Sequence, residues 1–132
     1  MKKDIVTRGD IEKLVDGFYN KVRKDTMLGF IFVDIAKVNW DTHLPIMYDF
    51  FENILFYTGP YSGNPMELHK HVNRLFPITD EHFSRWILLF NTTVDELFIG
   101  DSAELVKQRA KNIAEIMQMK IAGNPSRSEK IF

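Results

Sequence analysis

The sequence predicts an all-α protein, because apolar residues recur at helical spacing along most of the chain and no segment alternates steadily between apolar and polar residues. Its 132 residues suit one domain, and a hydrophobic content of 45% with 11 Phe indicates a substantial core or a large apolar ligand. We expect the domain to span residues 1–122. Residues 123–132 are polar and contain Gly and Pro, so we expect a flexible tail there.

The first helix is expected after Thr7, which stands three residues before Asp10 in a capping-box pattern. The apolar stripe of this helix is Ile11, Leu14, Val15, Phe18 and Val22. Tyr19 lies on the same inner side of the helix, beside this stripe. Gly29 interrupts the following segment, residues 27–35, so only a short turn of helix is expected there.

A third helix is expected to begin at Asn39 or Asp41, and Pro45 is compatible with it if it lies in the first turn. Its stripe has steps of four, three and four residues and consists of His43, Met47, Phe50 and Ile54. Residues 58–65 contain Gly and Pro signals typical of a loop. A short helix over residues 66–74 should follow this loop.

Two long helices complete the expected fold. Thr79 should cap the first of them, and Gly100 should end it. Its inner face is Phe83, Trp86, Ile87, Phe90, Val94 and Leu97. The last helix should begin at Asp101 or Ser102, with Val106, Ala110, Ile113 and Met117 facing inward.

Composition excludes several classes of function. The chain has no cysteine, which removes disulfides, thiolate zinc sites and cysteine nucleophiles. A net charge of −1 leaves no overall electrostatic footprint for a nucleic acid. No stretch approaches the roughly 20 apolar residues of a membrane span, and no apolar run follows the N-terminal lysines as in a signal peptide. We therefore expect a cytoplasmic protein with no membrane or nucleic-acid partner.

The four histidines are the obvious candidates for metal binding or acid–base chemistry. His69 and His71 are two residues apart, so on a helix they point to opposite sides, and neighbouring Leu68 and Val72 favour His69 as the inward one. Spacing alone leaves open whether His69 is a ligand or a core residue. His82 should lie in the first turn of its helix and face solvent.

Three further side chains bring polar tips into an otherwise apolar interior. Tyr19 lies beside the first stripe, His43 lies within the third, and Trp86 lies between two phenylalanines. Together they form either a buried polar network or a pocket whose ligand needs hydrogen-bond donors, and periodicity does not choose between the two. No zinc-protease, di-iron, P-loop or dinucleotide-binding motif competes with this reading.

Four blocks of sequence resemble the group III truncated haemoglobins, in that family's order. They are the opening segment FYNKVRKD with LGFIF (18–25 and 28–32), WDTHLPIM (40–47), YSGNPMELH (61–69) and FSRWILLF (83–90). In the third block a histidine, His69, stands four residues after a proline. The blocks cover most of residues 11–121, and their agreement in register makes the resemblance specific.

The resemblance implies a two-over-two helical sandwich that encloses haem b. It makes His69 the proximal iron ligand and the metal-binding residue. Lining the distal side would be Tyr19, His43 and Trp86, with Met47 and Phe32 as apolar wall. At Phe51 the sequence departs from the family, which often carries Trp there, so the shape of that wall is left open.

A haem protein of this kind should bind oxygen, nitric oxide and carbon monoxide reversibly. A pocket with several donors favours slow ligand release, and it suits oxygen, nitric oxide or peroxide chemistry better than bulk oxygen transport. Peroxidase-like turnover and nitric oxide detoxification are the two enzymatic activities that this predicts, and either would need an unidentified reductase. The alternatives are a haem-based sensor and a haem-free helical interaction module.

Overall fold

The computed structural model describes residues 2–35, 37–56 and 79–122, and these form the helical fold that the sequence predicts. In chain order the elements are α1 (Arg8–Lys24), α2 (Thr26–Gly29), the π-helical turn η1 (Phe30–Ile35), α3 (Trp40–Phe56), α5 (Asp80–Leu97) and α6 (Asp101–Ala122). The all-α assignment is therefore confirmed.

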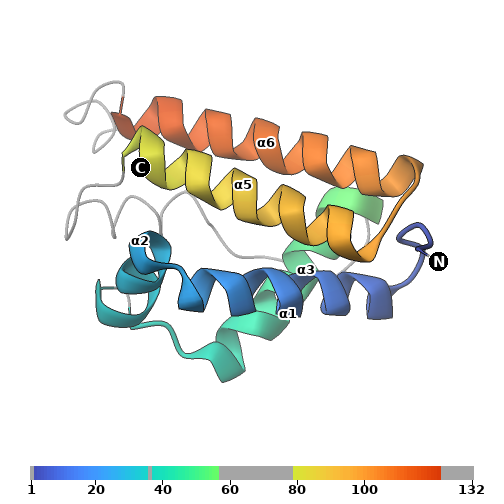
Figure 1. Ribbon diagram of the computed structural model, residues 1–132, viewed down its shortest axis with the longest axis horizontal. Coiled ribbons are helices and arrows are strands. Elements are labelled where there is room, and N and C mark those ends of the chain that lie inside the picture. Colours follow the sequence, from blue (N-terminus) through green and yellow to red (C-terminus); the bar gives the residue numbers. More distant parts are fainter. Residues whose placement is uncertain (1, 36, 57–78, 123–132) are drawn as a thin grey trace.

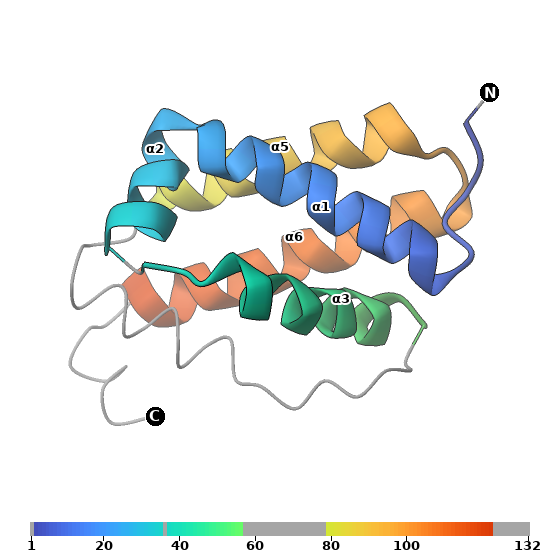
Figure 2. The same cartoon turned by 90° about the horizontal axis from the view of Figure 1, so that it is seen from below.

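The long helices pack in two layers. Figure 1 shows α5 and α6 side by side along one face of the molecule, with α1 and α3 crossing on the other. In the view of Figure 2, α1 lies over α5 and α3 lies over α6, and both of these pairs are in contact. This arrangement is the two-over-two sandwich that was expected. The side chains that meet between the layers form the core, so a group held there would touch both layers.

The capping box at the start of α1 is present as predicted. Asp10 N–H donates to Thr7 Oγ1 at 3.2 Å, and Thr7 N–H donates to the Asp10 carboxylate at 3.1 Å. Burial alone would raise the pKa of Asp10, but the ion pair with Lys3 at 2.8 Å and the backbone N–H donors outweigh it and lower that pKa to about 2. The inner stripe of α1 and Tyr19 are buried.

Contacts with α1 and α5 hold the short α2 in place, and they thereby position η1, the turn that follows it. The Asp25 carboxylate accepts two N–H groups from the first turn of α2 and forms a 2.7 Å ion pair with Arg85 of α5. A Cβ added at Gly29 would lie 2.6 Å from the carbonyl oxygen of Arg23, so this close approach to α1 requires glycine. The chain continues through Gly29 directly into η1, which carries Phe32.

Asn39 provides the cap of α3, because its side-chain oxygen accepts the N–H of Asp41 at 3.1 Å. Pro45 lies five residues after Trp40, where α3 begins, so it is beyond the first turn and inside the helix. Pro45 is exposed there. A proline can remain within a helix when water solvates the carbonyl that loses its N–H partner.

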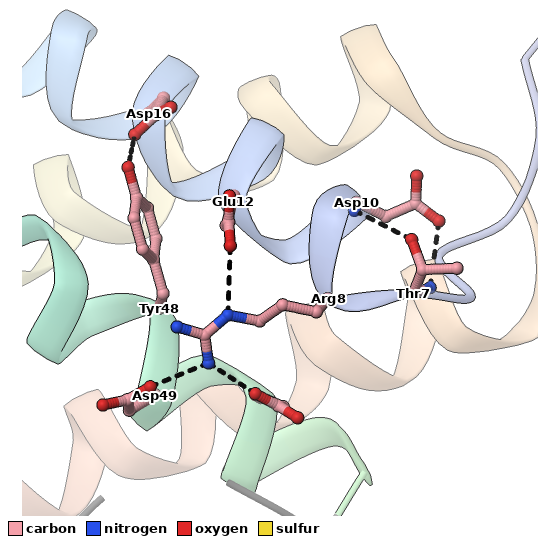
Figure 3. A network of polar contacts seen from close by, with 8 residues as sticks. Thr7, Arg8, Asp10, Glu12, Asp16, Tyr48 and Asp49 are labelled. Atoms are coloured by element: carbon pink, nitrogen blue, oxygen red, sulfur yellow. Dashed lines mark hydrogen bonds and ion pairs between the residues drawn. The ribbon is translucent and has the colours of Figure 1, made fainter. Parts of the chain in front are cut away.

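Ionic contacts join α1 to α3, the two helices that form one layer. The guanidinium of Arg8 donates to Asp49 at 2.7 Å and to Glu52 at 2.5 Å, and its Nε donates to Glu12 at 3.2 Å (Figure 3). Beside this cluster, the hydroxyl of Tyr48, the residue before Asp49, donates to Asp16, which lies one turn beyond Glu12 on α1. Burial and this hydrogen bond raise the pKa of Tyr48 to about 12.

The turn between α5 and α6 depends on glycine. Gly100 has a φ of +140°, a value that disfavours any side chain, and it ends the α5 segment as predicted. The carboxylate of Asp4 accepts the N–H groups of Ser102 and Ala103 at 2.9 Å each. The start of α6 is thus capped by a residue from the N-terminal segment, a long-range contact that local sequence patterns do not reveal.

At the start of α5, His82 lies in the first turn as expected, and its imidazole also takes part in the helix cap. Thr79 N–H donates to His82 Nδ1 at 2.8 Å, so the imidazole supplies part of the helix cap. His82 therefore contributes to the helix end and is not a free surface histidine.

Two expected features lie outside the described residues: the helix over 66–74 that carries His69, and the tail over 123–132. Within residues 2–35, 37–56 and 79–122, no helix is long and apolar enough to cross a membrane.

Candidate functional site

Tyr19 places a phenol in the interior between the two layers. Its side chain follows Val15 by four residues on the inner face of α1, and the residue is only 4% exposed. The hydroxyl forms no hydrogen bond with any described residue, and burial raises its pKa above the usual value. Tyr19 therefore stays protonated and keeps an unused hydrogen-bond donor in the interior.

His43 and Phe32 surround the Tyr19 ring from two other elements. The imidazole of His43, on α3, meets the phenol edge-on with ring centroids 5.2 Å apart, and its Nε2 atom is buried. Phe32, on η1, lies 5.9 Å from Tyr19 and 6.4 Å from His43, centroid to centroid. The structure therefore brings together three of the predicted site residues, which come from three different elements.

Trp86 approaches the same region from the other layer. Phe18 of α1 contacts both rings, with centroids 4.8 Å from Tyr19 and 5.2 Å from Trp86. The indole stacks on Phe90 at 5.7 Å, which fixes its plane. Its N–H forms no hydrogen bond within the described part of the chain. Trp86 is half-buried, so the indole borders the interior without closing it.

These polar tips do not form a closed network. No hydrogen bond joins Tyr19 to His43 or to Trp86, although all three residues are described. A buried network would satisfy its members with one another, because an unmet buried donor is costly. Among the described residues, the Tyr19 hydroxyl and the Trp86 N–H are therefore donors that a ligand between the layers could use.

The inner face of α3 is apolar but only partly covered. Phe51 and Leu55 are the buried residues of this helix, while its other inward apolar side chains remain half-buried: Leu44, Met47, Phe50 and Ile54. Met47 lies one turn beyond His43 on this face. Phe51, by contrast, is fully buried and stacks on Phe90 at 5.2 Å, so it belongs to the core and not to the open face.

Trp40 belongs to the site but was missed by the sequence analysis. Its ring lies 5.7 Å from Tyr19, 6.1 Å from Phe32 and 5.6 Å from His43. The sequence did contain a signal for Trp40: it precedes His43 by three residues, a spacing that places both residues on the same face of a helix. The stripe was read from His43 onward and left out the first residue of the helix.

His69, the predicted iron ligand, lies outside the described residues. Among the residues that are described, no group of three His, Asp or Glu side chains is placed to hold a metal ion by itself. The site thus combines a partly covered apolar face with unmet donors on Tyr19 and Trp86. These features fit a large, flat, apolar group that presents a small polar ligand, as haem does.

Comparisons with known proteins agree with this fit. The family model described as bacterial-like globin matches residues 4–122. A group 3 truncated haemoglobin of Campylobacter jejuni is 32% identical over 121 residues, which cover 89% of this chain and 93% of the relative. The crystal structure of the group III truncated haemoglobin from Campylobacter jejuni matches with a TM-score of 0.80 and 31% identity, covering 92% of this chain and 95% of that one. The chain therefore belongs to the bacterial-like globin family of haem-binding proteins, and within it to the group III truncated haemoglobins.

Proposed function

We propose that this globin holds haem b through His69 and binds oxygen, nitric oxide and carbon monoxide beside Tyr19, His43 and Trp86. The observation that carries the proposal is the buried Tyr19 side chain, whose hydroxyl has no described partner and whose ring packs against the His43 ring. Met47 and Phe32 provide apolar wall on the same side. The haem supplies an iron that coordinates a diatomic ligand and can change its oxidation state.

On the proximal side, a neutral imidazole of His69 is a good ligand for haem iron. Its second ring nitrogen needs a hydrogen-bond acceptor, which fixes the tautomer and the orientation of the ring. His71 lies two residues further along, on the opposite side of any helix that carries both. Of the two histidines, His69 is thus the one proposed to face the haem.

On the distal side, Tyr19 O–H and Trp86 N–H are donors that a polar ligand in the pocket can use. A neutral hydrogen bond contributes about 0.5–1.5 kcal/mol net, so each donor slows ligand release by up to about tenfold. Two donors in a dry pocket reinforce one another. Slow release is unfavourable for bulk oxygen delivery, and it supports a role in oxygen, nitric oxide or peroxide chemistry.

Turnover of nitric oxide or peroxide is the enzymatic form of this proposal. It requires electrons from a reductase, and the described residues do not identify that partner. Steady-state consumption of each substrate with an artificial electron donor distinguishes the peroxidase-like activity from the nitric oxide activity. If neither nitric oxide nor peroxide is consumed, the protein binds its ligands without turning them over.

Absorption spectra of the purified protein in ferric, ferrous and carbonyl forms test the haem assignment. We expect an intense Soret band that shifts on reduction and again with carbon monoxide. His69→Ala should lose most of its haem on gel filtration, while His71→Ala, the matched control, should retain it. A colourless, folded wild-type protein that takes up no haem would contradict the function, and full retention by His69→Ala would contradict the ligand assignment alone.

A further inference from the structure

Trp40 covers one side of the Tyr19–His43 pair. It is the first residue of α3, and its ring contacts three rings of the site: Tyr19 at 5.7 Å, His43 at 5.6 Å and Phe32 at 6.1 Å. The planes of Trp40 and Phe32 differ by 22°, so the two rings stack and form a continuous aromatic wall. These three contacts are made to side chains of α1, α3 and η1.

Arg23 contacts the outer side of this aromatic wall. It lies in the last turn of α1, and its guanidinium carbon is 4.8 Å from the centroid of the Trp40 ring. That distance is well within the range of a cation–π interaction, which is strongest for tryptophan. Figure 2 shows that α3 begins beneath the α1 helix, on the side where α1 leads into α2. The contact therefore joins the end of one helix to the start of the other.

The exposed fraction of the residue decreases from Arg23 through Trp40 to Tyr19. Arg23 is exposed, Trp40 is half-buried, and Tyr19 behind it is 4% exposed. The Trp40 ring is therefore the side chain that separates the buried phenol from the solvated guanidinium. Moving the ring outward requires loss of the Arg23 contact, and this contact can break and re-form because Arg23 is long, flexible and solvated.

We propose that Trp40, held in place by Arg23, is a gate that sets how fast diatomic ligands enter and leave the Tyr19–His43 site. The inference rests on the proposed haem function and adds to it a pair of positioning residues outside the predicted ligand set. A gate changes the barrier between solvent and site and leaves the bound and free states unchanged. It must therefore alter the association and dissociation rates by the same factor.

Laser photolysis of the carbonyl form, combined with ligand-replacement kinetics on the haem-loaded protein, measures both rates. Arg23→Met removes the charge but keeps the length of the side chain, and it should raise both rates several-fold with little change in affinity. Arg23→Lys keeps a cation over the ring and should restore rates near those of wild type. Trp40→Leu should accelerate both rates further, to about tenfold. Lys24→Met, which removes a neighbouring exposed charge from α1, is the matched control and should change neither rate.

A second readout does not depend on ligand binding. Urea unfolding of Arg23→Met, Trp40→Leu and the double variant should show that the two substitutions are not additive, because each removes the same contact. Additive midpoints, or Arg23→Met rates within twofold of wild type in a protein with normal spectra, would overturn the gate and leave the haem function standing. A wild-type chain that binds no haem would overturn both proposals.

Discussion

The imidazole of His43 meets the phenol of Tyr19 at an interplanar angle of 87°, with ring centroids 5.2 Å apart. The two residues lie on different helices, α1 and α3, and no hydrogen bond joins them. The edge of one ring therefore meets the face of the other, and a ligand that contacts one ring lies near the other. The Nε2 atom of His43 is also buried.

Tyr19→Phe should increase the rate of oxygen dissociation by about two- to tenfold, which corresponds to the loss of one neutral hydrogen bond. Burial raises the pKa of the Tyr19 hydroxyl, so the phenol remains a donor at neutral and moderately alkaline pH, and the effect should not depend on pH there. Stopped-flow measurement from pH 6 to 9 checks both points. Tyr48→Phe makes the same chemical change where the hydroxyl bonds Asp16, and it should leave the rate unchanged. Equal rates for Tyr19→Phe and wild type would remove Tyr19 from the mechanism.

Local signals in the sequence were sufficient for most of the fold. The Thr7–Asp10 capping box, the inner stripe of α1 and the break at Gly100 follow from contacts within a few residues, and they were predicted correctly. The cap that Asp4 supplies to α6 was not predicted, because it joins residues that are 98 apart in the sequence. Contacts of that kind depend on the packing of the layers.

The candidate site was predictable only in part, for similar reasons. Tyr19, His43 and Phe32 were selected by periodicity and family resemblance, and their rings do lie together. Trp40 was missed because the stripe on α3 was read from His43 onward. Its contact with Arg23 depends on how the end of α1 crosses the start of α3, which helical periodicity does not specify. The assignment of His69 stays a prediction.

Asp10→Asn should destabilise the protein near neutral pH by about 1–2 kcal/mol, as expected for a carboxylate whose pKa is lowered to about 2. The pKa of Asp10 is lower in the folded than in the unfolded state, so its contribution is fully present above about pH 4. It is lost as the pH falls from about 4 to about 2. Urea unfolding of wild type and variant should therefore converge across this window. Asp41→Asn, at an exposed position, is the control, and a constant difference down to pH 2 would exclude this origin.

Arg8→Met should lower the free energy of unfolding by about 1 kcal/mol at low salt, because it leaves three carboxylates close together without their cation. The figure is modest since the Arg8 side chain is 37% exposed and water screens it. The difference should shrink in 1 M salt, where the Debye length is about 3 Å. Lys13→Met removes an equal charge from an exposed position of α1 and should have little effect. A salt-independent loss for Arg8→Met would point to packing instead of charge.

Gly100→Ala should destabilise the protein by at least about 2 kcal/mol, from two separable causes. The backbone φ of +140° is strained for alanine, and the new Cβ would lie 2.4 Å from Cγ of Asp4, displacing the carboxylate that caps α6. Gly9→Ala is the matched control, since its Cβ would meet only Thr7 Oγ1 at 3.6 Å and alanine favours the helix. It should be neutral or slightly stabilising in urea unfolding.

Asp4→Gly separates the two causes, because it removes the cap together with all the side-chain atoms of Asp4 that the new methyl group would meet, including Cβ at 2.7 Å. Adding Gly100→Ala to Asp4→Gly should then cost less than adding it to wild type, and what remains measures the backbone strain. An equal cost in both backgrounds would show that Asp4 does not oppose the new methyl group. In that case φ at Gly100, and not the contact with Asp4, would be the reason that this turn requires glycine.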